Sequence, residues 1–202
     1  MAGFEEEVVR AYFEANGFLV RSAGLPPEAG KKRSGPLRTL AVFNPEAAEN
    51  ASDAGFRLYT SDVSRIRAGL VSVLGWETAG FTANLIGSDA ALLRFLKTEA
   101  TDKRLSSGFS PATSLPEARM GDCLHLLVVP ALPRADSKLK ESLEALREAG
   151  AQGVFTLRSM LENLLRRAEP GRDYAALPAM QALRILKAYG LAAEPQLELF
   201  PE

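Results

Sequence analysis

The segment Cys123 to Val129, CLHLLVV, is almost continuously apolar. A strand with one solvated face alternates apolar and polar residues, whereas a strand covered on both faces reads as an unbroken apolar run. We therefore expect residues 123–129 to form a central strand of a sheet. The polar exception is His125, the one histidine of the chain.

The residues that follow this segment predict a parallel neighbour for it. Leu139, Leu143 and Leu146 recur at helical spacing and indicate a helix over residues 136–149, which Gly150 ends. A short apolar strand is expected next, over residues 153–157. A strand, a helix and a strand in this order are typical of two parallel strands joined by a crossover.

The rest of the chain supplies further helices and strands around this unit. Helices are expected at residues 4–16, 89–100 (with Asp89 as N-cap), 158–168 and 178–189, and strands at 18–21, 37–43 and 70–76. Residues 22–36, 46–64 and 105–122 lack a clean period and are expected to be loops or irregular excursions. The order α-β-β-β-α-β-α-β-α-α predicts an α/β fold with a mixed central sheet.

Composition and charge narrow the class of protein. The chain has 202 residues with 24 basic and 25 acidic side chains, so its net charge of -1 does not indicate a polyanion-binding protein. We expect a single domain over residues 1–191 and a separate C-terminal segment over 192–202. The longest apolar run, Leu126 to Leu132, is too short to span a bilayer, and the first residues lack the pattern of a signal peptide. A soluble cytoplasmic protein is the expectation.

The residue types that carry catalysis are scarce. The lone Cys123 excludes an internal disulfide and a cysteine-based zinc site. Cys123 and His125 share a strand face, but alternate residues lie about 6–7 Å apart, so we expect a packed imidazole and a buried thiol rather than a catalytic pair. Phosphate-binding glycine motifs are absent. The run Lys31-Lys32-Arg33 is a candidate nucleic-acid contact, the alternative being solvated loop charges.

The order of elements over roughly residues 4 to 130 resembles the restriction-endonuclease-like PD-(D/E)XK superfamily. The features that carry this resemblance are a glutamate-rich first helix, the segment NGFLVR, a strand that ends in FNP and a strand that ends in GW. The resemblance implies an αβββαβ core. It also implies a divalent metal held by an acid on the second strand and by a carboxylate followed by x-Lys on the third.

The chain departs from that pattern at every catalytic position. Thr39 stands at the position of the acid, and Ser72 and Leu74 stand at the (D/E) and Lys positions. A hydroxyl is a weak Mg²⁺ ligand and leucine carries no charge. Glu77 and Asp62 lie nearby in the sequence, but neither is followed by x-Lys. We therefore expect no metal, no cofactor and no catalytic residues.

A second resemblance lies near the C-terminal end. The sequence Gln196-Leu197-Glu198-Leu199-Phe200 is similar to the QLxLF pentapeptide by which bacterial polymerases and mismatch-repair proteins bind the sliding clamp. Leucine and phenylalanine would fill an apolar pocket while the glutamine amide donates and accepts hydrogen bonds. The alternative is that Leu197, Leu199 and Phe200 pack against the domain itself.

These observations favour a noncatalytic accessory protein of bacterial DNA replication or repair that is recruited to the clamp. Two alternatives remain open. One is an active metal-dependent nuclease whose carboxylates have migrated, and the other is a dimerising scaffold without a nucleic-acid role. The expected partners are a sliding clamp and DNA but no membrane, and a homodimer is left open.

Overall fold

The computed structural model describes residues 3–23, 37–47, 55–77, 79–109 and 123–192. The helices are α1 (Phe4–Ala15), the 3-10 helix η1 (Thr60–Arg65), α2 (Ala83–Ile86), α3 (Asp89–Glu99), α4 (Asp102–Phe109), α5 (Asp136–Glu148), α6 (Leu157–Arg167) and α7 (Pro178–Ala188). The strands are β1 (Leu19–Ser22), β2 (Arg38–Phe43), β3 (Ala68–Val73), β4 (Leu124–Val129) and β5 (Gly153–Thr156). None of the described helices has the length and apolar character that crossing a bilayer requires.

The five strands form one mixed sheet in the order β1-β2-β3-β4-β5. The first three strands pair antiparallel, and β3, β4 and β5 pair parallel. The α/β class and the mixed sheet are therefore as predicted. The apolar segment forms β4, which lies between β3 and β5, and its residues Leu126–Val129 are buried.

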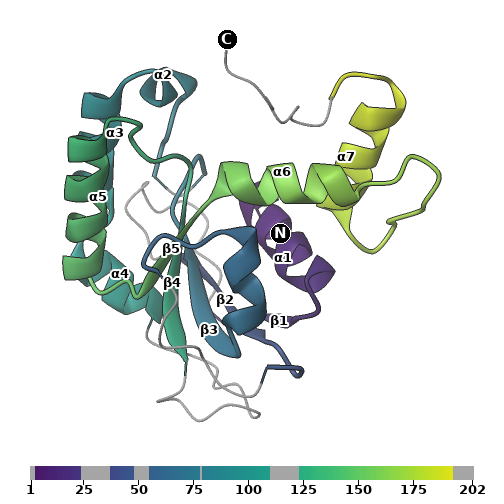
Figure 1. Cartoon of the computed structure of the whole chain (residues 1–202), viewed down its shortest axis with the longest axis horizontal. Coiled ribbons are helices and arrows are strands. Elements are labelled where there is room, and N and C mark those ends of the chain that lie inside the picture. Colours follow the sequence, from purple (N-terminus) through teal and green to yellow (C-terminus); the bar gives the residue numbers. More distant parts are fainter. Residues whose placement is uncertain (1–2, 24–36, 48–54, 78, 110–122, 193–202) are drawn as a thin grey trace, which may run out of the picture.

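Helices cover both faces of the sheet (Figure 1). On one face, Val9 of α1, Met160 of α6 and Met180 of α7 belong to one apolar core. On the other face, Leu96 of α3 and Leu146 of α5 belong to a second core. The predicted helices at 4–16 and 89–100 thus lie on opposite faces, and the alternation of side chains along each strand supplies both cores.

Two details of the region around α3 and α4 differ from the sequence prediction. Residues 105–109, expected to be loop, belong to α4. Leu105 and Phe109, one helical turn apart, are buried and hold this short polar helix on the sheet. The predicted N-cap Asp89 is also wrong. Ser88 caps α3 by accepting from the Ala91 backbone N–H, which leaves the Asp89 carboxylate to bind the loop before α5.

The excursion between β2 and β3 has a defined role in its described part. The Leu58 backbone N–H donates to the Val154 oxygen, and the Val154 N–H donates to the Phe56 oxygen. Residues 56–58 therefore cover the outer edge of β5, and η1 leads the chain back to β3. Covering an edge removes unpaired backbone groups that would otherwise attract another strand.

The third strand is displaced from its predicted bounds. Residues 70–76 were expected, but β3 spans Ala68–Val73. The Leu74 backbone N–H still donates to the Val128 oxygen of β4, whereas the Trp76 N–H donates to the Glu5 carboxylate of α1. A side chain from a distant helix thus ends the strand, and the local sequence does not reveal this contact.

Candidate functional site

The three positions that the resemblance assigns to catalysis lie together on one face of the sheet. Thr39 of β2 pairs with Ser72 of β3, and Leu74 follows two residues later, on the same face. Thr39 Oγ1 and Ser72 Oγ are 2.9 Å apart and share a hydrogen bond. All three side chains are buried. The sheet therefore brings these three positions together, and they carry two hydroxyl groups and a leucine side chain.

Helix α4 lies directly over this hydroxyl pair. A Cβ atom added at Gly108 would stand 2.7 Å from Ser72 Oγ and 3.3 Å from Thr39 Oγ1. Magnesium requires about six oxygen ligands in near-octahedral geometry, usually including carboxylates. Here the hydroxyls are bonded to each other and the helix backbone fills the space above them. The residues of this site do not fit a divalent metal.

The carboxylates that could replace the missing ones are engaged elsewhere. The Asp62 side chain accepts from the Tyr59 backbone N–H at 2.8 Å, and Glu77 Oε1 accepts from the Phe4 N–H at 3.0 Å. Over the described ranges, no group of three or more His, Cys, Asp or Glu side chains is arranged to hold a metal ion. Within the described residues, no observation therefore favours the alternative of an active nuclease whose carboxylates have migrated to other positions.

A reciprocal pair of carboxylates joins the start of α1 to the end of β3. Glu5 accepts from the backbone N–H groups of Trp76 at 2.8 Å and Glu77 at 3.0 Å, while Glu77 accepts from Phe4. A Cβ atom at Gly75 would lie 2.0 Å from Glu5 Oε1, so only glycine permits this approach. Burial raises the pKa of Glu5, and the two backbone donors oppose that rise.

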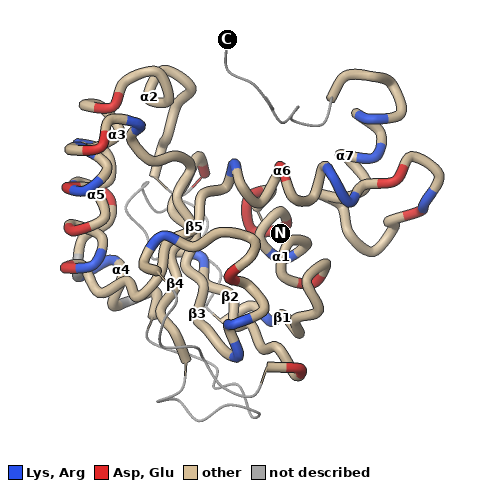
Figure 2. Tube along the Cα trace, viewed as in Figure 1, with Lys and Arg blue, Asp and Glu red and all other residues tan. Residues whose placement is uncertain are grey.

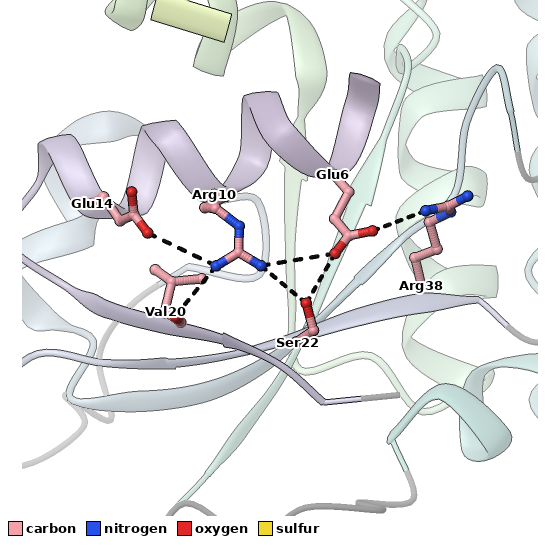
Figure 3. A network of polar contacts seen from close by, with 6 residues as sticks. All are labelled: Glu6, Arg10, Glu14, Val20, Ser22 and Arg38. Atoms are coloured by element: carbon pink, nitrogen blue, oxygen red, sulfur yellow. Dashed lines mark hydrogen bonds and ion pairs between the residues drawn. The ribbon is translucent and has the colours of Figure 1, made fainter. Parts of the chain in front are cut away.

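Glu6 is the centre of a second polar network beneath α1 (Figure 3). Its carboxylate accepts from Arg38 of β2 at 3.0 Å and from the Ser22 hydroxyl of β1 at 3.1 Å. Arg10 lies 3.8 Å from Glu6 and from Glu14, and it also donates to Ser22. Because two guanidinium groups and a hydroxyl contact this carboxylate, it holds α1 on the sheet.

Sequence reasoning did not single out Glu5 and Glu6, which it treated as ordinary residues of the first turn. One available signal was the helical spacing of Glu5 with the apolar residues Val8, Val9 and Tyr12, which places its side chain on the buried stripe. Apart from Arg10, the partners of both carboxylates lie 16 to 72 residues away along the chain. That separation hides the networks from any local pattern.

His125 packs as an aromatic side chain. Its ring stacks on Phe109 of α4 with centroids 4.5 Å apart and planes 6° from parallel. Partial burial lowers the pKa of the imidazole. Cys123 lies just before β4 and is half-buried. The packed imidazole is as expected from the sequence, whereas Cys123 was expected to be buried in the strand and is half-buried just before it.

Five basic side chains of α6, α7 and the loop between them contact their own chain, whereas Arg166 of α6 is exposed. The partners are Glu162 for Arg158, the backbone oxygen of Ala15 for Arg167, the Tyr174 ring for Arg172, Asp173 for Arg184 and the backbone oxygen of Leu165 for Lys187. Acidic and basic positions are interspersed along α3 and α5 on the other side of the sheet (Figure 2). The candidate contacts Lys31, Lys32 and Arg33 lie outside the described residues.

The candidate clamp-binding residues Gln196, Leu197, Leu199 and Phe200 also lie outside the described residues. Comparison of the chain with protein-family models, with curated proteins and with solved structures gives no significant match. The case for a function therefore depends on the geometry above and on the two resemblances in the sequence.

Proposed function

We propose that this chain is a noncatalytic accessory protein of bacterial DNA replication or repair, recruited to the sliding clamp by residues 196–200. The observation that carries the noncatalytic part is the buried hydroxyl pair of Thr39 and Ser72, which α4 covers at Gly108. Positions that would hold carboxylates and a lysine in a nuclease instead stabilise the sheet. A fold of this kind can still recognise DNA or a protein without cutting anything.

The recruitment part depends on the chemistry of the C-terminal peptide. Pro195 favours an extended chain at Glu194 and donates no backbone hydrogen bond, so the motif would be presented as an extended segment. Leu199 and Phe200 would fill the apolar pocket, and Gln196 would fix the register. A short peptide buries little area and must be ordered on binding, so we expect a dissociation constant around 1 μM, or about 8 kcal/mol.

The DNA part assigns Lys31, Lys32 and Arg33 to phosphate contacts. Each phosphate that a cation neutralises contributes about 0.9 to the slope of log K against log salt on duplex DNA. Replacing the three residues by alanine should therefore weaken binding to any duplex sequence and lower that slope by about 2 to 3. An unchanged slope would remove these residues from the interface.

The recruitment is tested by pull-down with a purified bacterial sliding clamp. The full chain should retain the clamp, and a chain truncated after Pro195 should not. Glu198→Ala is the matched control, because it alters the same peptide at the position that the QLxLF pattern leaves free. Equal retention by the full and the truncated chain, or no retention by either, would reject recruitment through this peptide.

A further inference from the structure

Exposed apolar side chains gather at the end of α7. Nine large apolar residues of the described chain are exposed, and four of them are Ile185, Leu186, Tyr189 and Leu191. Tyr189 and Leu191 are the most exposed of all, at 78% and 74%. The other five are scattered over several elements, namely Phe4, Leu19, Tyr59, Trp76 and Ile86. Single exposed apolar residues are ordinary, whereas a cluster indicates a contact surface.

The two halves of α7 have different surroundings. Ala179 and Met180 in its first half are buried in the core shared with α1 and α6, and Leu183 packs against that core. The C-terminal part of α7 extends away from the sheet (Figure 1). The packing of the first half thus fixes the position of the second, whose apolar residues contact no comparable core among the described residues.

The backbone that carries this cluster is also ordered at the C-terminal end of α7. Gly190 adopts a positive φ of 67°, and the Leu191 backbone N–H donates to the Leu186 oxygen at 2.8 Å. This bond closes the helix and fixes Leu191 beside the last turn. A surface that is ordered before binding loses less conformational entropy when a partner covers it.

The chemistry of the cluster favours a protein partner over a nucleic acid. The nearby cations are directed to their own chain, since Lys187 donates to the Leu165 oxygen and Arg184 donates to the Pro170 oxygen. A tyrosine surrounded by aliphatic side chains is typical of the centre of a protein interface.

We propose that Ile185, Leu186, Tyr189 and Leu191 form a second contact surface for the sliding clamp, an inference that rests on the proposed function. Leu191 precedes Gln196 by five residues, which an extended chain spans in at most about 18 Å. A clamp that holds Gln196 therefore has its surface within reach of this patch. The patch adds affinity to the peptide because both belong to one continuous stretch of chain.

The test measures the affinity of a purified bacterial sliding clamp for the full chain, for a variant with Tyr189→Ser and Leu191→Ser, and for a synthetic peptide of residues 193–202. The full chain should bind about tenfold more tightly than the peptide, and the variant should bind like the peptide. Ile86→Ser, an exposed apolar residue on α2, is the matched control and should leave the affinity unchanged. Both substituted positions are largely exposed, so the variant should keep the thermal midpoint of the wild type.

Several results would overturn the inference, and they are distinguishable. Equal affinities for the full chain, the variant and the peptide would retain clamp recruitment but remove the patch from it. Tighter binding by the variant would indicate that the patch instead holds the chain's own C-terminal peptide. Sedimentation that shows a wild-type dimer and a monomeric variant would assign the patch to a second copy. Binding by none of the three would reject the proposed function itself.

Discussion

Thr39 Oγ1 of β2 and Ser72 Oγ of β3 form a buried hydrogen bond of 2.9 Å between directly paired residues of neighbouring strands. Two carboxylates in these places would repel each other and would need a cation between them. Two hydroxyls satisfy each other without one. The pair therefore explains how this face of the sheet accepts a covering helix at Gly108.

Removal of one partner of this bond should destabilise the fold more than removal of both. Thr39→Val leaves the Ser72 hydroxyl buried without its partner, which costs about 1–3 kcal/mol of unfolding free energy. Adding Ser72→Ala to that variant should recover most of the lost unfolding free energy, because no buried hydroxyl is then left without a partner. Urea unfolding of the two single variants and the double variant measures the coupling. Strictly additive losses would show that the two hydroxyls act independently.

Gly108→Ala should destabilise the protein by about 1–3 kcal/mol, because the new methyl group would overlap Ser72 Oγ at 2.7 Å. Combination with Ser72→Ala removes that atom and should restore part of the loss. Gly171→Ala is the matched control, since nothing lies within 4 Å of a Cβ atom at that position. If Gly108→Ala has the same unfolding free energy as the wild type, α4 does not pack tightly against the hydroxyl pair.

The two glutamates that flank Arg10 on α1 should differ in their contributions. Glu6→Ala removes a largely buried acceptor of Arg38 and Ser22, and we expect a loss of about 2 kcal/mol. Glu14→Ala removes a more exposed partner of Arg10 one helical turn away and should cost less than about 0.5 kcal/mol. Thermal or chemical unfolding of both variants compares them. Equal losses would contradict the anchoring role of the Glu6 network.

Acidification should weaken the fold through His125. Partial burial lowers the pKa of its imidazole in the folded state, so the unfolded chain takes up the proton first as the pH falls below about 6.5. The contribution of His125 is thus present above that pH and is lost as the pH falls toward the folded pKa. Unfolding free energies at pH 7.5 and 5.5 should fall less for His125→Gln than for the wild type. The carboxylates common to both proteins cancel in this comparison.

The elements with a strong local period were predictable from the sequence. The apolar run of β4 and the helical spacing of α5 each depend on neighbouring residues, and both elements form close to their predicted bounds. Gly150, expected to end the helix over residues 136–149, adopts a positive φ of 100°. Local chemistry alone determines these features.

The missed features depend on partners that are distant in the sequence. Helix α4 has a polar sequence, and its burial comes from Leu105 and Phe109 lying on the sheet. The end of β3 depends on Glu5, 71 residues before Trp76. Strand pairing could be expected to bring Thr39 and Ser72 together, but the helix that covers them could not. Long-range contacts of this kind have no local signature.

Wild-type protein should not cleave DNA in the presence of Mg²⁺ or Mn²⁺. The Thr39, Ser72 and Leu74 positions offer no carboxylate to offset the loss of the ion's water shell. Plasmid and oligonucleotide substrates, single- and double-stranded, would be incubated at high protein concentration. Reproducible cleavage that is lost on replacing one specific carboxylate, Glu5 and Glu77 being the first to examine, would favour the active nuclease.

The central claim is recruitment through residues 196–200, and titration calorimetry of the full chain against a purified bacterial sliding clamp tests it most directly. The wild type should bind with a dissociation constant of about 0.1–1 μM, since the peptide accounts for about 1 μM and the surface at the end of α7 adds up to about tenfold. The double variant Leu199→Ala, Phe200→Ala should show no binding and keep the thermal midpoint of the wild type. A wild type that does not bind the clamp, together with a large fall in the midpoint of the double variant, would instead show that the segment belongs to the core of this domain.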